Sequence, residues 1–215
     1  MTTGRCGSGS IDLMTTSGDT GITLRAFRLN AAVNHLMFAG RRGRVYDRIV
    51  VLSGVQPGDS VLDVGSSSGY LTGRLAAAAG PSGRVTGVDP SKPAIAYARR
   101  HARPGMAYTV GVAQDLSLPD ASFDIVTCTL AMHHIPARQR QAAFAEMYRV
   151  TRPGGRLLTA DLAPLLRLGR QGEPQATAAG SLPDLAATAG YLVDSAGQLP
   201  LLRYIVAVRP QESPG

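Results

Sequence analysis

Length, composition and charge already exclude several classes of protein. A chain of 215 residues is long enough for one sizeable α/β domain and too short for two comfortable ones. No stretch reaches the roughly 18 apolar residues of a membrane-spanning helix, and Cys6 and Cys128 give neither a disulfide framework nor a zinc motif, so we expect a cytoplasmic protein. The net charge of +7 is almost all arginine, and with 5% aromatic residues it gives little support to nucleic-acid binding.

The predicted elements begin with a flexible leader over residues 1–22, which is rich in Gly, Ser and Thr and lacks the apolar run of a signal peptide. A single domain is expected over residues 23–209. Its first part, residues 23–55, predicts cap helices because apolar side chains recur there at helical spacing. Residues 210–215 are expected to form a frayed tail.

Strands and helices alternate from residue 60 onward. Short apolar runs predict buried strands at residues 60–64, 84–88, 106–110, 123–130 and 156–160. Helical patterns follow them at residues 70–79, 91–102, 138–150 and 181–189, and residues 162–180 predict a loop over the site. Two last strands, 191–195 and 201–208, predict a hairpin with its turn at 196–198. This order predicts an α/β fold with a doubly wound, mostly parallel, seven-stranded sheet and a C-terminal antiparallel hairpin.

The first segment with chemical meaning is the turn Asp-Val-Gly-Ser-Ser-Ser-Gly at residues 63–69. Its small residues let the backbone approach a ligand closely, and the N–H groups at the start of the next helix face that ligand. Asp89 ends the following strand, twenty residues after Gly69, where a carboxylate can accept hydrogen bonds from both hydroxyls of an adenosine ribose. Either feature alone is compatible with an ordinary connection or a surface acid, but together they predict a nucleoside site.

The turn lacks the Gly-x-Gly-x-x-Gly spacing of NAD-binding proteins and instead resembles the first motif of class I S-adenosylmethionine-dependent methyltransferases. The resemblance extends from about residue 45 to residue 208, and it also rests on residues 85–91, 118–126, 130–134 and 149–157. Members that act on quinones and natural products look most similar. The resemblance implies a Rossmann-like fold, S-adenosyl-L-methionine as cofactor and S-adenosyl-L-homocysteine as product.

The resemblance also assigns residues to the cofactor. Asp63 would lie near the methionine ammonium, Asp89 would hold the ribose, and Pro90 would lie against the adenine. Backbone contacts with the methionyl and ribose parts would come from Gly65, Ser66, Ser67, Gly69, Thr129 and Leu130. The adenine side would be formed by Val112, Ala113 and Gln114. No metal is implied.

Two residues depart from the family pattern. Ser67 replaces the middle glycine, and a serine is well tolerated there only if its φ is negative. Val112 stands where the family commonly has an aspartate that accepts from the adenine amino group, so Gln114 or Asp115 would have to supply an acceptor, while the N–H of Ala113 can still bind adenine. One lost hydrogen bond weakens binding by up to about tenfold without abolishing it. These departures keep open a non-methylating member of the fold, such as a cofactor-binding cyclase or a regulatory binder.

His133 and His134 follow the fourth strand, at the edge where a substrate must lie. Either they cap the strand end, or one of them, with His133 as the candidate, deprotonates a hydroxyl during methylation. Base-modifying family members carry an Asn/Asp-Pro-Pro-aromatic segment there, whereas residues 129–133 read Thr-Leu-Ala-Met-His, which argues against a nucleic-acid methyltransferase. The expected function is methyl transfer to a small, fairly apolar acceptor. The sequence leaves the acceptor and the oligomeric state open.

Overall fold

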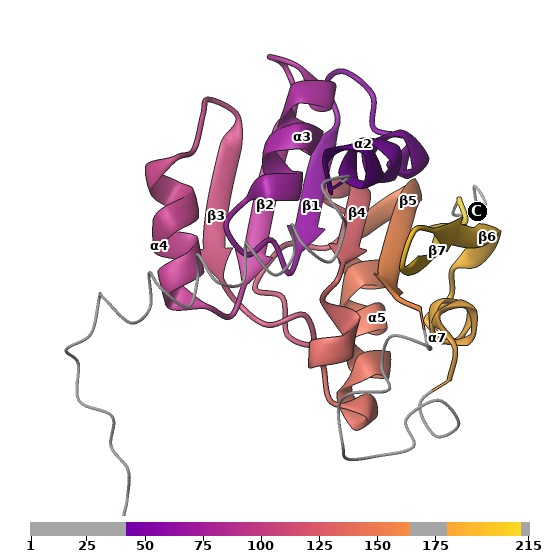
Figure 1. The fold of residues 1–215 in the computed structure, drawn as a ribbon. Helices are drawn as coiled ribbons and strands as arrows, with labels where there is room; N and C mark the ends of the chain where they lie inside the picture. The colour runs from indigo at the N-terminus through magenta and orange to yellow at the C-terminus, as the bar shows by residue number, and fades with distance from the viewer. Residues whose placement is uncertain (1–41, 164–179, 212–215) are drawn as a thin grey trace, which may run out of the picture.

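The computed structural model of this chain describes residues 42–163 and 180–211 (Figure 1). The predicted leader, the first cap helix and most of the predicted loop over the site lie outside these residues. No helix in the described ranges is both long and apolar enough to span a bilayer.

One seven-stranded sheet forms the centre, and its strands run across Figure 1 in the order β3-β2-β1-β4-β5-β7-β6. The strands are β1 (Ser60–Val64), β2 (Arg84–Asp89), β3 (Met106–Val110), β4 (Phe123–Thr129), β5 (Thr151–Leu162), β6 (Leu192–Leu199) and β7 (Leu202–Val208). The first five pair in parallel, and β7 is antiparallel to both β5 and β6. The predicted fold class, with its C-terminal hairpin, is confirmed.

Helices cover both faces of the sheet, because the buried strands carry apolar side chains on both sides. The helices are α2 (Arg42–Ser53), α3 (Tyr70–Ala79), α4 (Lys92–Arg100), α5 (Arg140–Val150) and α7 (Leu182–Thr188), with short 3-10 turns η1 (Met132–His134) and η2 (Ala137–Gln139). Val61 packs with α2 and α3 in one cluster, while its neighbour Leu62 packs with α5 and α7 in the other. This alternation along β1 is the two-residue period of a strand.

The chain reverses its direction across the sheet beside β1. From β1 it proceeds outward through β2 to β3, and it then returns to place β4 on the other side of β1. In open α/β sheets, ligands bind at the carboxyl ends of the strands near such a reversal. We therefore expect a ligand site among the residues that follow β1, β2 and β4.

Two sequence-based boundaries were wrong. Residues 153–155 do not form a turn before β5, because that strand begins at Thr151 and absorbs them as an irregularity in its pairing with β4. The hairpin turn is not at residues 196–198 either, since β6 continues to Leu199. Gly197 lies within the strand opposite Tyr204, and a Cβ on this glycine would come within 2.6 Å of the tyrosine hydroxyl. Glycine here accommodates a neighbouring ring rather than a reversal of the chain.

Candidate cofactor and acceptor site

The turn after β1 is tied directly to β2. The N–H groups of Gly65 and Ser66 both donate to the carbonyl of Val88, at 2.8 and 3.0 Å. Gly65 has a φ of 77°, and a Cβ at this position would collide with the side chain of Ala131. Only glycine meets both conditions, so the turn is held against β2 and against the segment that follows β4.

Ser67 lies in the left-handed region, with a φ of 48°. The condition on which a serine was expected to be tolerated is therefore not met. A residue with a Cβ loses roughly 1–2 kcal/mol in this region. The Ser67 N–H donates to Oδ2 of Asp89 at 2.9 Å, and this hydrogen bond to a carboxylate offsets part of the strain.

Asp89 connects the turn to the start of α4. Its Oδ1 accepts from the N–H of Ser91 at 2.8 Å, and the Ser91 hydroxyl in turn accepts from Ala94 at the first turn of the helix. A carboxylate offers about four acceptor positions, of which two are used by these backbone groups. The other positions remain for the hydroxyls of a ligand, and the exposed Pro90 lies beside them.

Asp63 is buried at the end of β1, with 2% of its surface exposed. Its carboxylate accepts from the hydroxyl of Thr72 at 2.6 Å and from that of Thr127 at 3.1 Å. Burial raises the pKa of Asp63 to about 6, although both hydroxyl donors act in the opposite direction. The site therefore holds a carboxylate whose negative charge is poorly solvated, which favours a nearby cation.

Two buried hydroxyls border this region without a partner among the described residues, those of Ser66 and Thr129. Thr129 is the last residue of β4 and follows Thr127 by one strand period, so the two side chains share a face. Leu130 comes next with a φ of 56°, and its N–H donates to Ala160. Unpaired hydroxyls are costly in a protein interior. Their presence fits a polar ligand such as S-adenosylmethionine across the ends of β1 and β4.

The loop after β3 contains the residues expected on the adenine side. Val112 is 37% exposed, and its carbonyl accepts from Asp115 across a tight turn. The side-chain nitrogen of Gln114 donates to the side-chain oxygen of Gln139 at 3.2 Å. The carbonyl oxygen of the Gln114 amide is thereby left as an acceptor on this loop.

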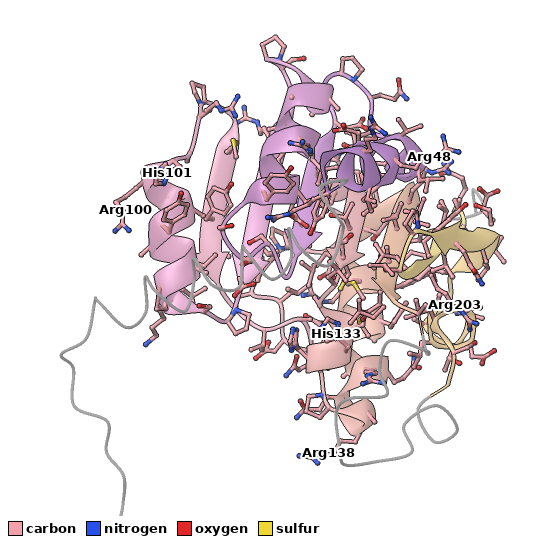
Figure 2. All side chains as sticks on the ribbon, viewed as in Figure 1. Arg48, Arg100, His101, His133, Arg138 and Arg203 are labelled. Carbon is pink, nitrogen blue, oxygen red and sulfur yellow. The ribbon has the colours of Figure 1, made fainter. Side chains whose placement is uncertain are left out.

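His133 forms a close pair with Asp161, near the point where the chain leaves β4 (Figure 2). Its ring Nδ1 lies 2.7 Å from Oδ1 of Asp161, and its backbone N–H donates to Oδ2 at the same distance. Because a carboxylate can only accept, Nδ1 carries the proton and the lone pair of the neutral ring is on Nε2. The ring of His134 lies 4.0 Å away and is tilted by 42°.

Asp161 was missed by the sequence analysis. It lies in β5, is 1% exposed, and also accepts from the N–H of Leu162 at 2.7 Å. The signal was present, since an acid that ends an otherwise buried strand at the ligand edge is the same pattern that identified Asp89. His133 and Asp161 are 28 residues apart, and only the pairing of β4 with β5 brings them together.

Comparison with known proteins agrees with this geometry. The protein-family model described as a methyltransferase domain matches residues 61–155. The chain is 36% identical over 132 residues to a demethylmenaquinone methyltransferase of Symbiobacterium thermophilum, which covers 59% of this chain and 52% of the relative. It is 31% identical over 126 residues to the ubiquinone/menaquinone biosynthesis C-methyltransferase UbiE of Psychromonas ingrahamii, which covers 56% and 49%. The chain thus spans about half the length of these curated relatives.

Among solved structures, a SAM-dependent methyltransferase from Aquifex aeolicus is similar with a TM-score of 0.65 at 19% identity, over 76% of this chain and 89% of that one. At this identity the similarity concerns the fold, and it agrees with the observed strand order. The family match begins in β1, includes the turn and Asp89, and ends within β5. Residues 61–155 of this chain are therefore similar to the methyltransferase domain family, and the fold around them is that of the solved SAM-dependent methyltransferase.

Proposed function

We propose that this chain transfers a methyl group from S-adenosylmethionine to a small, fairly apolar acceptor. The observation that carries the proposal is the hydrogen bond from Ser67 to Asp89, which joins the glycine-rich turn to the acid at the end of β2. It fixes the carboxylate beside the turn while leaving two acceptor positions for ribose hydroxyls. The buried hydroxyls of Ser66 and Thr129 add polar groups without partners in the described structure.

In this proposal the cofactor is held along the ends of β1, β2 and β4. Asp89 binds the ribose, Pro90 and Val112 lie against the adenine, and Asp63 supplies negative charge for the methionine ammonium. The backbone of residues 65–69, Ala113, Thr129 and Leu130 makes the remaining contacts, with Gln114 as acceptor for the adenine amino group. When bound, S-adenosylmethionine supplies a methyl group on a sulfonium, a good leaving group, so the protein contributes mainly alignment and exclusion of water.

His133 is the proposed general base. Asp161 holds its ring through Nδ1, so that Nε2 can accept a proton from a hydroxyl of the acceptor. The proton moves to Nε2 as the acceptor becomes nucleophilic, and the resulting imidazolium is stabilised by the buried carboxylate. Asp161 acts through His133 and is a positioning residue.

For the acceptor we propose a reduced quinone, whose ring hydroxyl would give its proton to His133 as a ring carbon takes the methyl group from the sulfonium. Loss of the hydrogen on that carbon as a proton, with reprotonation of the ring oxygen, then restores the aromatic hydroquinone. The names of the relatives support this class, since they are a demethylmenaquinone methyltransferase and a ubiquinone/menaquinone biosynthesis C-methyltransferase. This chain spans only about half the length of these relatives, so their acceptor is a proposal for this chain and needs its own experiment.

Titration calorimetry with S-adenosylmethionine and S-adenosylhomocysteine tests the cofactor, and transfer of a deuterated methyl group to a panel of hydroquinones, phenols and amines tests the reaction. We expect both nucleosides to bind and hydroquinones to be methylated at carbon. Absence of binding would refute the methyltransferase proposal. Binding without transfer to any member of the panel would favour the non-methylating binder, and transfer only to amines would refute the proposed acceptor class.

A further inference from the structure

A cavity begins at Ser68 and Gly69, the last residues of the glycine-rich turn, and runs along the sheet face between α3 and α4. Its volume is about 240 Å³, and its far end is at Met106, the first residue of β3. It thus extends from the turn toward the amino end of β3, whereas the other proposed cofactor residues follow the carboxyl ends of the strands. Four strand spacings, roughly 20 Å, separate β3 from the strand of Asp161. The far end of the cavity is therefore remote from the proposed acceptor site.

Four of the ten residues that line the cavity carry aromatic rings. Tyr70 comes from α3, Tyr108 from β3, and Tyr97 and His101 from α4. The rings of Tyr97 and His101 stack on each other, with centroids 4.1 Å apart and planes 25° from parallel. Figure 2 shows His101 on α4. The two residues are one helical turn apart on α4, and their rings together form a flat surface. A planar ligand ring can pack against such a surface.

A glycine in the middle of α3 keeps this cavity open. Gly73 has no left-handed φ that would require glycine, and a Cβ placed on it would meet only the methyl group of Met106, at 3.9 Å. Glycine weakens the interior of a helix relative to alanine. Neither the backbone nor the packing of the described residues requires it here, so its contribution is the space that a side chain would occupy.

The one charged side chain among the described residues that line the cavity is positive, that of Arg103. Two more guanidinium groups, those of Arg42 and Arg74, lie 3.9 and 4.5 Å from the centre of the Tyr70 ring. No acidic side chain is among the described residues that line the cavity. An anion is therefore favoured over a cation or a neutral molecule.

We propose that this cavity is a second ligand site, which binds a small aromatic anion. The ring lies between Tyr70 and the Tyr97–His101 stack, and its carboxylate or phenolate pairs with Arg103. The volume is below the roughly 300–1,000 Å³ of sites for drug-sized ligands, so the occupant has one or two rings. The site shares Gly69 with the proposed cofactor turn but does not depend on methyl transfer, so it is tested in the absence of S-adenosylmethionine.

The probe is 2-naphthoate, with the neutral isostere 2-naphthamide as its control, in titration calorimetry with the full chain. We expect 2-naphthoate to bind with a sub-millimolar dissociation constant and 2-naphthamide to bind at least fivefold more weakly. Arg103→Gln should weaken 2-naphthoate at least fivefold. The matched control Arg100→Gln removes the same charge from an exposed position that does not line the cavity, and it should change the constant by less than twofold.

Gly73→Leu is the second variant, and it should abolish naphthoate binding by filling the cavity while its circular dichroism melt stays cooperative. If Gly73→Leu fails to fold, the comparison of Arg103→Gln with Arg100→Gln decides alone. The proposal is overturned if the wild-type chain shows no binding at millimolar naphthoate, if the amide binds as tightly as the acid, or if both arginine variants weaken binding equally. Undiminished binding to a folded Gly73→Leu variant would also overturn it.

Discussion

The ends of β1 and β2 differ from the ends of β4 and β5 in how they hold their chemical groups. At the ends of β1 and β2, the backbone N–H groups of Ser67 and Ser91 donate to the carboxylate of Asp89 and fix its position. At the second pair, a side chain holds a side chain, since Asp161 orients the imidazole of His133. The first region is suited to binding, because its groups are fixed before a ligand arrives. The second is suited to moving a proton, because one nitrogen of a titratable ring is left available.

The two regions should therefore respond to mutation in different observables. Changes beside β1 and β2 should alter cofactor affinity and stability, whereas changes beside β4 and β5 should alter turnover.

Asp161→Asn should lower kcat by about 100-fold or more while leaving the dissociation constant of S-adenosylhomocysteine within twofold of wild type. The amide has one accepting oxygen in place of two and no negative charge, so it cannot accept from both the Nδ1 and the backbone N–H of His133, and the ring loses its orientation and its stabilised charged form. The measurements are methyl transfer to the proposed hydroquinone acceptor, calorimetry, and the pH–rate profile, whose base-dependent limb should flatten. A variant that keeps its wild-type profile would show that Asp161 only caps η1.

A second readout does not depend on turnover. In the wild-type protein, ¹⁵N NMR of the histidine rings should show the neutral His133 protonated at Nδ1, as its contact with Asp161 requires. Asp161→Asn should shift that tautomer toward Nε2. If the wild-type ring is protonated at Nε2, the proposed base has no lone pair toward the acceptor and the assignment fails.

Asp89→Ala should weaken cofactor binding at least tenfold, equivalent to about 1.5–3 kcal/mol, because two charge-assisted hydrogen bonds to the ribose are lost. It should also lower the melting temperature, since the N–H groups of Ser67 and Ser91 lose their acceptor. Asp89→Asn keeps one acceptor oxygen, so its affinity for the cofactor should lie between those of the wild-type protein and Asp89→Ala. Calorimetry and thermal melts decide this, and an unchanged dissociation constant would mean that the ribose binds elsewhere.

The pKa of Asp63 predicts a stability that falls as the pH rises. Burial raises this pKa to about 6 in the folded protein, whereas the unfolded value is about 3.9. Between these values the folded state retains a proton that the unfolded state has lost, so the folded state is favoured at the lower pH. The free energy of unfolding should be about 1 kcal/mol larger at pH 5 than at pH 7 on account of this group alone. Denaturant titrations of the wild-type protein and of Asp63→Asn at pH 5 and pH 7 measure this change in the free energy of unfolding. If the free energy changes by the same amount in both proteins, Asp63 is not the group responsible.

Ser67→Gly should stabilise the protein by about 0.5–1 kcal/mol. Glycine adopts the left-handed φ of 48° without the cost of a Cβ, and this gain exceeds the additional entropy of the unfolded chain. Ser68→Gly is the matched control, because Ser68 has no left-handed φ and only the entropy loss remains, which should destabilise slightly. If both variants destabilise equally, the turn is not strained at Ser67.

Much of the fold followed from local patterns in the sequence. The bounds of β1, α3 and β3 agree with their predicted ranges, since each is a short run with a clear period between strong turn residues. The turn and Asp89 were also predictable, because glycine and a strand-end acid have few other uses in this order. Patterns of this kind depend on residues that are close to one another in the sequence, so they can be recognised without the structure.

Contacts between distant segments had to be decided by the tertiary structure. The left-handed φ of Ser67 depends on an acceptor 22 residues away, and the glycine at 197 reflects a tyrosine on the next strand rather than a turn. Asp161 reaches His133 only because β5 pairs with β4, and the aromatic cavity exists only because α3 and α4 lie side by side over β3. The sequence thus indicated which elements form and where the glycine-rich turn lies. The packing of those elements determined which side chains meet, because hydrogen bonds and cavities depend on distances in space that residue spacing does not encode.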